Sequence, residues 1–309
     1  MKSIGIVLVD WNGLEVTLPC LEALSMLHHD PAFTVKIVVV DNGSDTPIEN
    51  SIKERFPNVI VIRSDENLGF AGGNNIGIRY LIDKRFDYTL LLNNDTLVDP
   101  DFLSPLFQHL TSNDRIAAVQ PKIHFVHEPH RIWNAGTHFN KLLGTTGTRG
   151  YGQTDKGQFE QPEKMSWLTG CCMLIDNRVF LNKAIGMLSE GYQTYYEDAD
   201  WSMRVRKQGY ELHYVPASRI RHIAGYSVNR SSLTQEGPKN PFVVYLHTRN
   251  RIWFMRSYTP FYFKPISYPY QLLYIIGLSA YYFLKGRRVK LSMVGKAFQE
   301  GFFQRPPNA

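Results

Sequence analysis

The stretch YTLLLNNDT, residues 88–96, decides the fold class of this 309-residue chain. Its first five residues are hydrophobic or β-branched without alternation, and two amides and an acid follow at once. An uninterrupted run of this kind is typical of a strand that is buried on both faces. Comparable runs occur earlier, at residues 4–9, 35–40 and 59–62. The four runs together predict a parallel α/β sheet.

Segments with helical periodicity separate these strands, as parallel strands require, because the chain must cross back over the sheet between them. We predict helices at residues 14–27, 47–56 and 75–83. Ligands of such sheets bind beyond the carboxyl ends of the strands. Polar side chains follow three of the strands here: Asp10 with Asn12, Asp41, and Asn93 with Asn94 and Asp95. One edge of the sheet is therefore expected to collect the carboxylates.

The following part of the chain is less regular. Residues 121–162 are rich in glycine and aromatic side chains and predict an inserted β-rich flap or a loop on the acceptor side. Regular patterns return with a strand at residues 167–175, a helix at 198–208 and a strand at 211–215. Residues 219–227 complete the compact part. We find no internal repeat.

The net charge of +6 lies at one end of the chain. Residues 240–309 contain ten Lys or Arg and one acid, so residues 1–239 carry a net charge of −3. A domain that coats nucleic-acid phosphates would itself be basic, so we expect no nucleic-acid partner. The mean hydropathy of −0.26 excludes a protein with many membrane spans. We divide the chain into a compact domain, residues 1–239, and a basic C-terminal region, residues 240–309.

The C-terminal region contains a stretch without charge at residues 265–284, followed by Lys285. Pro265 and Pro269 are expected to interrupt its start and leave 16 residues. Such a helix is about 24 Å long, shorter than the hydrocarbon core of about 30 Å. We therefore expect an interfacial helix pair on a membrane surface. A helix buried against the rest of the protein and a true span are the alternatives.

Three cysteines, Cys20, Cys171 and Cys172, form neither a disulfide framework nor a CxxC pair. Residues 1–3 lead directly into the first predicted strand, without a segment that resembles a secretion signal. Both features favour a reducing, cytoplasmic compartment.

Asp95 can bind a divalent cation that bridges the phosphates of a nucleotide, because hard cations prefer oxygen ligands. Asp41 can accept hydrogen bonds from a base or ribose. For both acids the alternative is a turn after the strand. Residues 67–75 hold three glycines and three asparagines before the predicted helix, which would let the backbone approach a polar ligand closely. Their spacing is not GxGxxG, which disfavours a nicotinamide dehydrogenase.

Three acids, Glu197, Asp198 and Asp200, lie at the start of the helix predicted at residues 198–208. Helix capping is the simple explanation, because acids are favoured at the positive helix end. However, three neighbouring acids repel one another, which favours a site where one acts as a base with a shifted pKa. His222 can bind a metal or a diphosphate, or serve the structure alone.

In combination, these motifs resemble the inverting family 2 glycosyltransferases of the GT-A fold, most closely the rhamnosyltransferase-like branch that builds bacterial surface polysaccharides. The resemblance covers about 220 residues. It is carried by residues 40–46 (VDNGSDT), 66–78 (ENLGFAGGNNIGI), 91–96 (LLNNDT), 133–136 (WNAG), 167–175 (WLTGCCMLI), 195–210 (YYEDADWSMRVRKQGY) and 222–227 (HIAGYS). Arg249, Asn250 and Arg251 also resemble the family's helix that follows the catalytic part.

The resemblance implies a nucleotide-diphospho-sugar transferase with a Rossmann-like mixed sheet. In it, Asp198 is the general base, and Glu197 and Asp200 orient the acceptor and the helix. Asp95 is the metal-binding acid, with Asn93 and His222 as further ligands for Mg²⁺ or Mn²⁺. Asn93 departs from the family, where an acid is usual, and an amide coordinates more weakly.

The same resemblance implies that residues 1–120 bind the nucleotide sugar and residues 121–239 face the acceptor. Asp41 contacts the nucleobase in this interpretation. The other implied substrate contacts are Asp10, Asn12, Asn67, Gly69, Asn74, Asn94 and Trp167. The first strand ends in Asp-Trp-Asn where relatives often carry Asn-Tyr-Asn, which is a second departure.

The implied partners are a nucleotide-sugar donor, a glycan or polyprenyl-diphosphate-linked acceptor, and the inner face of the cell membrane, contacted by the C-terminal region. A nucleotidyltransferase is one rival, although its Gly-rich basic loop is absent after the first strand, at residues 10–13. A membrane-attached nucleotide-binding protein without catalysis is the other, suggested by Asn93.

Overall fold

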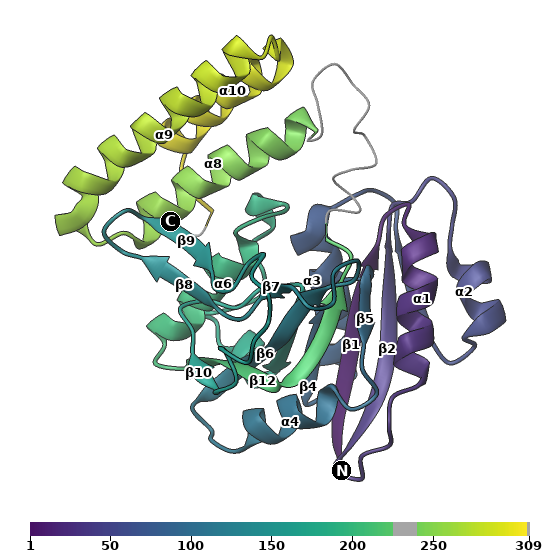
Figure 1. Cartoon of the computed structure of the whole chain (residues 1–309). Coiled ribbons are helices and arrows are strands. Elements are labelled where there is room, and N and C mark those ends of the chain that lie inside the picture. The colour runs from purple at the N-terminus through teal and green to yellow at the C-terminus, as the bar shows by residue number, and fades with distance from the viewer. Residues whose placement is uncertain (225–239, 308–309) are drawn as a thin grey trace.

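The structure, a computed structural model, describes residues 1–224 and 240–307, and its centre is a ten-stranded mixed sheet (Figure 1). Four strands form the predicted parallel part, in the spatial order β3-β2-β1-β4. They are β1 (Lys2–Asp10), β2 (Phe33–Asn42), β3 (Ile60–Ser64) and β4 (Tyr88–Leu92). The crossover helices are α1 (Leu14–Ser25), α2 (Glu49–Arg55) and α3 (Gly69–Asp83). The prediction for this part is confirmed.

The other side of the sheet is mixed, because β11 (Cys172–Asp176) pairs antiparallel with both β4 and β6 (Ile116–Phe125). The strand predicted at residues 167–175 is therefore shorter and lies later. β12 (Glu211–His222) then runs parallel to β6. It joins the two segments predicted at residues 211–215 and 219–227 into one strand with an irregularity between Val215 and Arg219. Residues 225–227 of that prediction lie outside the described residues.

Short strands complete the β structure. Within the predicted flap, β7 (Ile132–Asn134) pairs with β6, and β8 (Thr137–Asn140) pairs with β9 (Thr145–Thr148), so the β-rich prediction is confirmed. β5 (Thr96–Val98) and β10 (Glu163–Lys164) pair with β12. The remaining elements of this part are α4 (Leu103–Thr111), α5 (Arg178–Leu181), the 3-10 turn η1 (Glu190–Tyr192) and α6 (Glu197–Lys207).

Helices cover both faces of the sheet with separate apolar cores. On one face α1, α2 and α4 pack through side chains such as Leu21, Ile52 and Leu106. On the other, α3, α5 and α6 contribute residues such as Ile78 and Trp201. With both faces occupied, the ends of the strands are left for a ligand.

Helix α3 begins at Gly69, six residues before its predicted start. The glycines there are needed for packing: a Cβ on Gly77 would lie 2.4 Å from Cγ1 of Val7, and one on Gly73 would lie 2.7 Å from Cγ1 of Val9. The expectation that residues 67–75 form a loop against a ligand is therefore wrong for most of the stretch. These glycines bring α3 close to β1.

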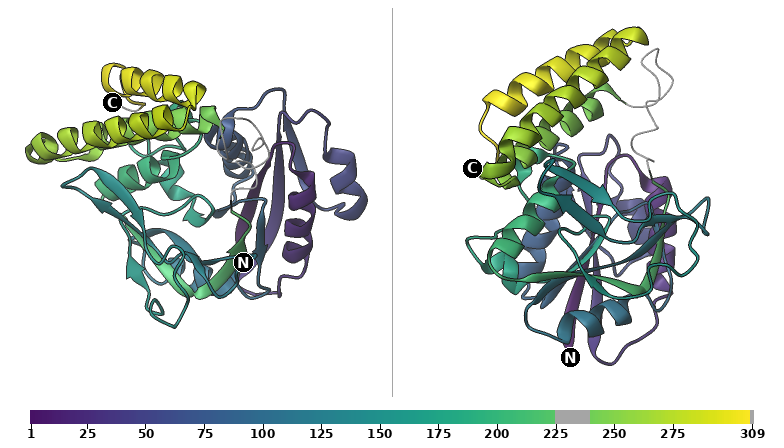
Figure 2. Two further views of the ribbon diagram at one scale, coloured as in Figure 1. Left: turned by 45° about the horizontal axis from the view of Figure 1, so that its top comes forward. Right: turned by 60° about the vertical axis from the view of Figure 1, so that its left-hand side comes forward.

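The C-terminal region forms a helical layer over one end of the sheet (Figures 1 and 2). It consists of α8 (Pro241–Tyr258), the turn η2 (Phe261–Phe263), α9 (Lys264–Leu284) and α10 (Arg288–Phe303). Helix α9 includes both prolines, contrary to the prediction that they interrupt it. Pro265 lies in the first turn of the helix, where an N–H would have no helical partner. The N–H that Pro269 lacks would have bonded to the carbonyl of Pro265, so the loss is confined to one hydrogen bond of the first turn. None of the described helices combines the length and apolar character that a membrane span needs.

Candidate active site

The carboxylates at the ends of β1 and β2 lie inside the protein. Asp10 and Asp41 are register partners, with exposed fractions of 0% and 1%. Asp10 accepts hydrogen bonds from the Gly13 N–H (3.1 Å), the Thr17 hydroxyl and the Asn94 amide (3.3 Å). Burial raises the pKa of Asp10. Asp10 and Asn94 therefore connect the end of β1 with α1 and with the residues that follow β4.

Asp41 is occupied in the same way. It accepts hydrogen bonds from the Ser44 N–H (3.0 Å) and the Ile48 N–H (3.4 Å), and it forms an ion pair with Arg63. Asn12 braces the same loop, since its side chain donates to Asp45 at 3.2 Å. Asp41 and Asn12, both predicted to contact the nucleotide sugar, therefore stabilise the loop that follows β2.

The side chain that does face solvent at this edge is Trp11, which is 51% exposed. An exposed indole after a buried strand offers a flat apolar face to a base or sugar ring. In the sequence, Trp11 stands out only as part of the Asp-Trp-Asn departure from the family pattern. Its position within a polar cluster was the signal in the sequence.

The three predicted contacts from residues 67–75 also bond within the protein. Asn67 accepts hydrogen bonds from the Asn42 amide (3.1 Å) and the Gly69 N–H (2.9 Å). Asn74 is buried and donates to the Phe70 carbonyl at 2.9 Å. These bonds organise the start of α3, and of the three residues only Asn67 is exposed.

The predicted metal ligands come together after β4. Asp95 Oδ1 lies 2.9 Å from His222 Nε2, and the Asn93 amide nitrogen lies 3.4 Å from the same ring atom. The other ring nitrogen, His222 Nδ1, is buried without a hydrogen-bond partner, and Trp133 packs edge-on against the ring at 4.6 Å. Burial alone would lower the pKa of His222, but Cys171 and Asp95 outweigh it and raise that pKa to about 10.

Two adjacent ligand atoms from Asp95 and His222, with an amide beside them, fit a divalent cation that takes its other oxygens from elsewhere. Within residues 1–224 and 240–307, no group of three His, Cys, Asp or Glu side chains could hold a metal. The described residues therefore fit a cation that is shared with a diphosphate better than one that the protein holds by itself.

The three acids of α6 have three different environments. Asp198 is partly exposed, and its oxygens accept hydrogen bonds from the N–H groups of Gly170 (2.9 Å) and Ala199 (2.7 Å). Asp200 is 1% exposed and accepts hydrogen bonds from Arg204 (3.0 Å) and from the Tyr258 hydroxyl (2.6 Å). Asp200 therefore joins α6 to α8, while Asp198 is the acid that an acceptor can reach.

Glu197 is buried without a full set of hydrogen-bond partners. It is 4% exposed, and its Oε2 has no hydrogen-bond partner. Burial, followed by the neighbouring Asp198, raises the pKa of Glu197 well above its usual range, and burial also raises the pKa of Asp198. A protonated Glu197 leaves the negative charge of this group to Asp198.

The base candidate and the metal ligands meet at one short segment. Gly170 donates its N–H to Asp198, and the next residue, Cys171, accepts the Asn93 N–H at 2.8 Å and lies beside His222. Trp167, just before them, donates to the His138 carbonyl at 3.1 Å and packs near α6. The sequence-predicted acids Asp95 and Asp198 are therefore brought together.

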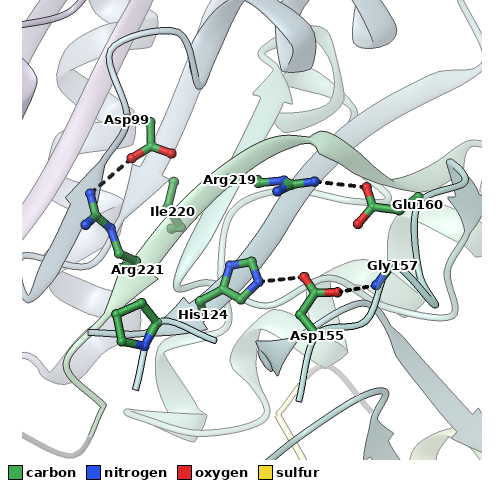
Figure 3. A pocket seen from close by; sticks show the side chains of 9 residues that line it. Asp99, His124, Asp155, Gly157, Glu160, Arg219, Ile220 and Arg221 are labelled. Carbon is green, nitrogen blue, oxygen red and sulfur yellow. Dashed lines mark hydrogen bonds and ion pairs between the residues drawn. The ribbon is translucent and has the colours of Figure 1, made fainter. Parts of the chain in front are cut away.

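A charged cavity of about 800 Å³ lies elsewhere, along β12 (Figure 3). Its walls carry three acids and three basic groups: Asp99, Asp155, Glu160, His124, Arg219 and Arg221. They pair with one another, as in the contact of 2.8 Å between His124 and Asp155. Because neighbouring strand residues point to opposite faces, Arg221 faces this cavity while His222 faces Asp95. The cavity is distinct from the acid site.

Comparison with known proteins decides the family. Residues 6–182 match the sequence profile of "Glycosyl transferase family 2". The chain belongs to this family. It is a glycosyltransferase that uses nucleotide sugars.

Its curated relatives include rhamnosyltransferases. The chain is 26% identical over 231 residues to N-acetylglucosaminyl-diphospho-decaprenol L-rhamnosyltransferase of Mycobacterium tuberculosis, covering 68% of this chain and 72% of the relative. It is 27% identical over 207 residues to rhamnosyltransferase WbbL of Escherichia coli K12 (63% and 75% covered). It is 24% identical over 192 residues to dTDP-rhamnosyl transferase RfbF of Shigella flexneri (61% and 60% covered). The rhamnosyltransferase-like resemblance is confirmed.

Solved structures confirm the GT-A fold class. GalNAc-T7, crystallised with UDP, GalNAc and Mn²⁺, has a TM-score of 0.58 at 16% identity, covering 83% of this chain but 51% of that one. The mannosyltransferase PcManGT from Pyrobaculum calidifontis, in complex with GDP-Man and Mn²⁺, has a TM-score of 0.57 at 12% identity, covering 97% and 87%.

The raised pKa of Glu197 predicts a pH-dependent stability. Above the usual glutamate pKa of 4.5, the unfolded chain loses this proton while the folded protein keeps it, so folding stability falls as the pH rises toward the folded pKa. Glu197→Gln cannot titrate. Its unfolding temperature relative to wild type should therefore increase between about pH 5 and pH 8, measured by differential scanning calorimetry.

A difference for Glu197→Gln that falls or stays constant with pH would show that Glu197 is ionised in the folded protein.

Proposed function

We propose that this enzyme transfers rhamnose from a nucleotide-linked donor to a glycan acceptor carried on a polyprenyl diphosphate, with inversion at the anomeric carbon, in the synthesis of a cell-surface polysaccharide. The observation that carries the proposal is the meeting of Asp198 and the Asp95–His222 pair at residues 170–171. The names of the relatives support rhamnose as the sugar and a lipid diphosphate as the carrier.

In this mechanism Asp198 accepts the proton of the acceptor hydroxyl while that oxygen forms its bond to the anomeric carbon. The bond from the anomeric carbon to the diphosphate oxygen breaks, and the electron pair leaves with the diphosphate. The N–H groups of Gly170 and Ala199 fix the Asp198 carboxylate in place. A single displacement of the diphosphate by the acceptor oxygen inverts the configuration at the anomeric carbon.

Asp95 and His222, with the Asn93 amide, would hold a Mg²⁺ or Mn²⁺ ion. When bound, the cation neutralises charge on the leaving diphosphate. The structures of GalNAc-T7 and PcManGT, both with Mn²⁺, support a divalent cation in this fold. Because the cation would be shared with the donor's diphosphate, donor binding should be metal-dependent.

The outer surface of the helical layer supports the proposed membrane contact. Of the described large apolar side chains that are exposed, about half lie on η2 and α9. They are Phe261, Tyr262, Ile266, Tyr270, Leu272, Leu273, Tyr274, Ile276, Tyr281, Phe283 and Leu284. Lys285, Arg287 and Arg288 follow at the end of α9. An apolar surface of this size beside cations suits the interface of an anionic membrane. It would hold the enzyme at the inner face of the cell membrane, where a lipid-linked acceptor is presented.

Asp198→Asn tests the base. It should lower turnover by about 10²- to 10⁴-fold and leave donor affinity unchanged, because it removes proton transfer but not the donor contacts. Thermal stabilisation by dTDP-rhamnose, UDP-hexoses and GDP-sugars first selects the donor, and transfer or donor hydrolysis by the full chain is then measured.

Asp101→Asn, at an exposed acid far along the chain from α6, is the control and should retain full turnover. Near wild-type turnover of Asp198→Asn would remove Asp198 from this role. Formation of a nucleotide sugar from a nucleoside triphosphate and a sugar phosphate would instead identify a nucleotidyltransferase.

Asp95→Ala tests the proposed cation site without an activity assay. Calorimetric titration of wild type with dTDP should show tighter binding in the presence of Mn²⁺, and this gain should disappear in the variant. Asp99→Ala, which removes an exposed acid that pairs with Arg221, is the matched control and should keep the gain. An equal gain in Asp95→Ala would contradict the assignment.

A triple variant tests the membrane surface. Phe261→Ser, Leu273→Ser and Phe283→Ser remove three of its most exposed apolar side chains and should abolish cosedimentation with phosphatidylglycerol vesicles. The matched control replaces Met26, Tyr151 and Leu181, which are 60%, 61% and 67% exposed on other parts of the protein. Equal vesicle binding by both triple variants would refute the assignment.

A further inference from the structure

The segment directly before α6 has an unusual backbone. Gln193, Tyr195 and Tyr196 have left-handed φ angles of 62°, 72° and 75°. Residues with a Cβ avoid this region unless the surrounding structure holds them there, and such strain clusters at functional sites. Tyr196 directly precedes α6, whose second residue is Asp198. The backbone of this segment therefore sets where the proposed base points.

Helix α8 holds the segment from one side through a single buried amide. Asn250, which is 0% exposed, directs its Nδ2 at the carbonyl oxygens of Tyr192 (2.9 Å), Thr194 (3.0 Å) and Tyr195 (2.8 Å). An amide nitrogen carries two hydrogens, so three carbonyls at these distances use its whole donor capacity. These contacts join residues separated by more than 50 positions in the chain.

The neighbours of Asn250 on α8 reinforce this contact. Arg249 Nε donates to Asn250 Oδ1 at 3.0 Å, which fixes the orientation of the amide, and Arg249 Nη2 donates to the Gly191 carbonyl at 3.1 Å. One turn earlier, the His247 ring stacks on the Tyr195 ring with 4.0 Å between centroids.

Helix α3 holds the segment from the other side. The Ala71 N–H donates to the Gln193 carbonyl at 2.9 Å, and the Phe70 N–H donates to the Thr194 hydroxyl at 3.2 Å. A Cβ on Gly69 would lie 2.8 Å from the Gln193 carbonyl oxygen, so this position must be glycine for the contact to form. The N–H groups at the start of α3, predicted to approach the donor, are used by this segment instead.

We infer that Asn250 is a positioning residue for Asp198: its amide holds the carbonyls of residues 192, 194 and 195, and with them the positive-φ backbone at residues 193, 195 and 196 that determines where α6 begins. The inference rests on the proposed role of Asp198 as the base. It goes beyond that role because it makes the C-terminal region, which the sequence analysis assigned to membrane contact, a structural part of the active site.

Gln193 offers a way to separate positioning from general stability. The Thr194 N–H bonds to the Tyr192 carbonyl at 2.8 Å, which makes Gln193 the centre of a strained γ-turn, and its side chain is exposed. Glycine adopts this backbone without strain. Gln193→Gly should therefore reduce the need for Asn250 without removing a buried contact.

The first experiment measures the segment itself and needs no substrate. In hydrogen–deuterium exchange of the full chain, Asn250→Ala should raise exchange at amides 193–199 by at least tenfold, and the double variant with Gln193→Gly should bring it back toward wild type. Arg256→Ala is the matched control, because Arg256 lies on the same helix but donates to the Gly301 and Gln304 carbonyls at 2.6 and 2.7 Å. Exchange in Asn250→Ala that does not exceed that of Arg256→Ala would overturn the inference.

The second experiment measures turnover with the donor selected by thermal stabilisation. Asn250→Ala should lower kcat by about 10- to 100-fold with an unchanged KM for the donor, since a small displacement of a catalytic group has effects of this size. Gln193→Gly should restore part of that kcat, and Arg256→Ala should retain it. Faster exchange at amides 193–199 with an unchanged kcat in Asn250→Ala would refute the positioning role. A loss of kcat that Gln193→Gly does not partly restore would refute it as well.

Two further results keep the two proposals distinguishable. If Asn250→Ala does not fold, His247→Ala can replace it, because His247 is exposed and its ring stacks on the Tyr195 ring. This variant should also raise exchange at amides 193–199 and lower kcat, by smaller factors. Unchanged exchange and kcat in His247→Ala would count against the inference. If Asp198→Asn keeps full turnover, the proposed base is wrong, while hydrogen exchange still decides whether Asn250 holds the segment.

Discussion

Parallel pairing of β1, β2 and β4 is the constraint on which the site depends. It brings three strand ends to one edge, and because helices cover both faces of the sheet, that edge is where a donor can enter. The acids at the edge then divide the work according to burial. Asp10 and Asp41, fully surrounded by donors, brace the loops, whereas Asp95 pairs with His222 next to the segment that also holds Asp198.

The three acids of α6 show how environment separates identical chemistry. Asp200 forms an ion pair with Arg204 and accepts a hydrogen bond from the Tyr258 hydroxyl, while burial raises the pKa of Glu197. Asp198 keeps backbone N–H donors and access to solvent, which are the conditions for a carboxylate that must accept a proton and release it again. The cluster is therefore compatible with one charge at the reacting position instead of three.

Much of the fold could be predicted because its strands are uninterrupted apolar runs. The acids of α6 could be found because three carboxylates within four residues repel one another, which is unusual outside a functional site. The predicted start of α3 was wrong because glycine has a low helix propensity, so Gly73 and Gly77 did not indicate a helix. Their close packing against β1 is what places them in one. The short strand β5 could not be predicted, because three residues give too little periodicity to detect. The sequence pattern places Asn250 in the helix after the catalytic part but gives it no role, because its three carbonyl partners lie more than 50 residues earlier.

The path of α8 matters for how the protein can be handled. One side of the helical layer carries the exposed apolar face of α9, and the other side carries the buried contacts of α8 with residues 191–195. A truncation at residue 240 would take away both at once. A variant that replaces the exposed apolar side chains of α9 should therefore keep the full length of the chain, so that α8 still supports residues 191–195.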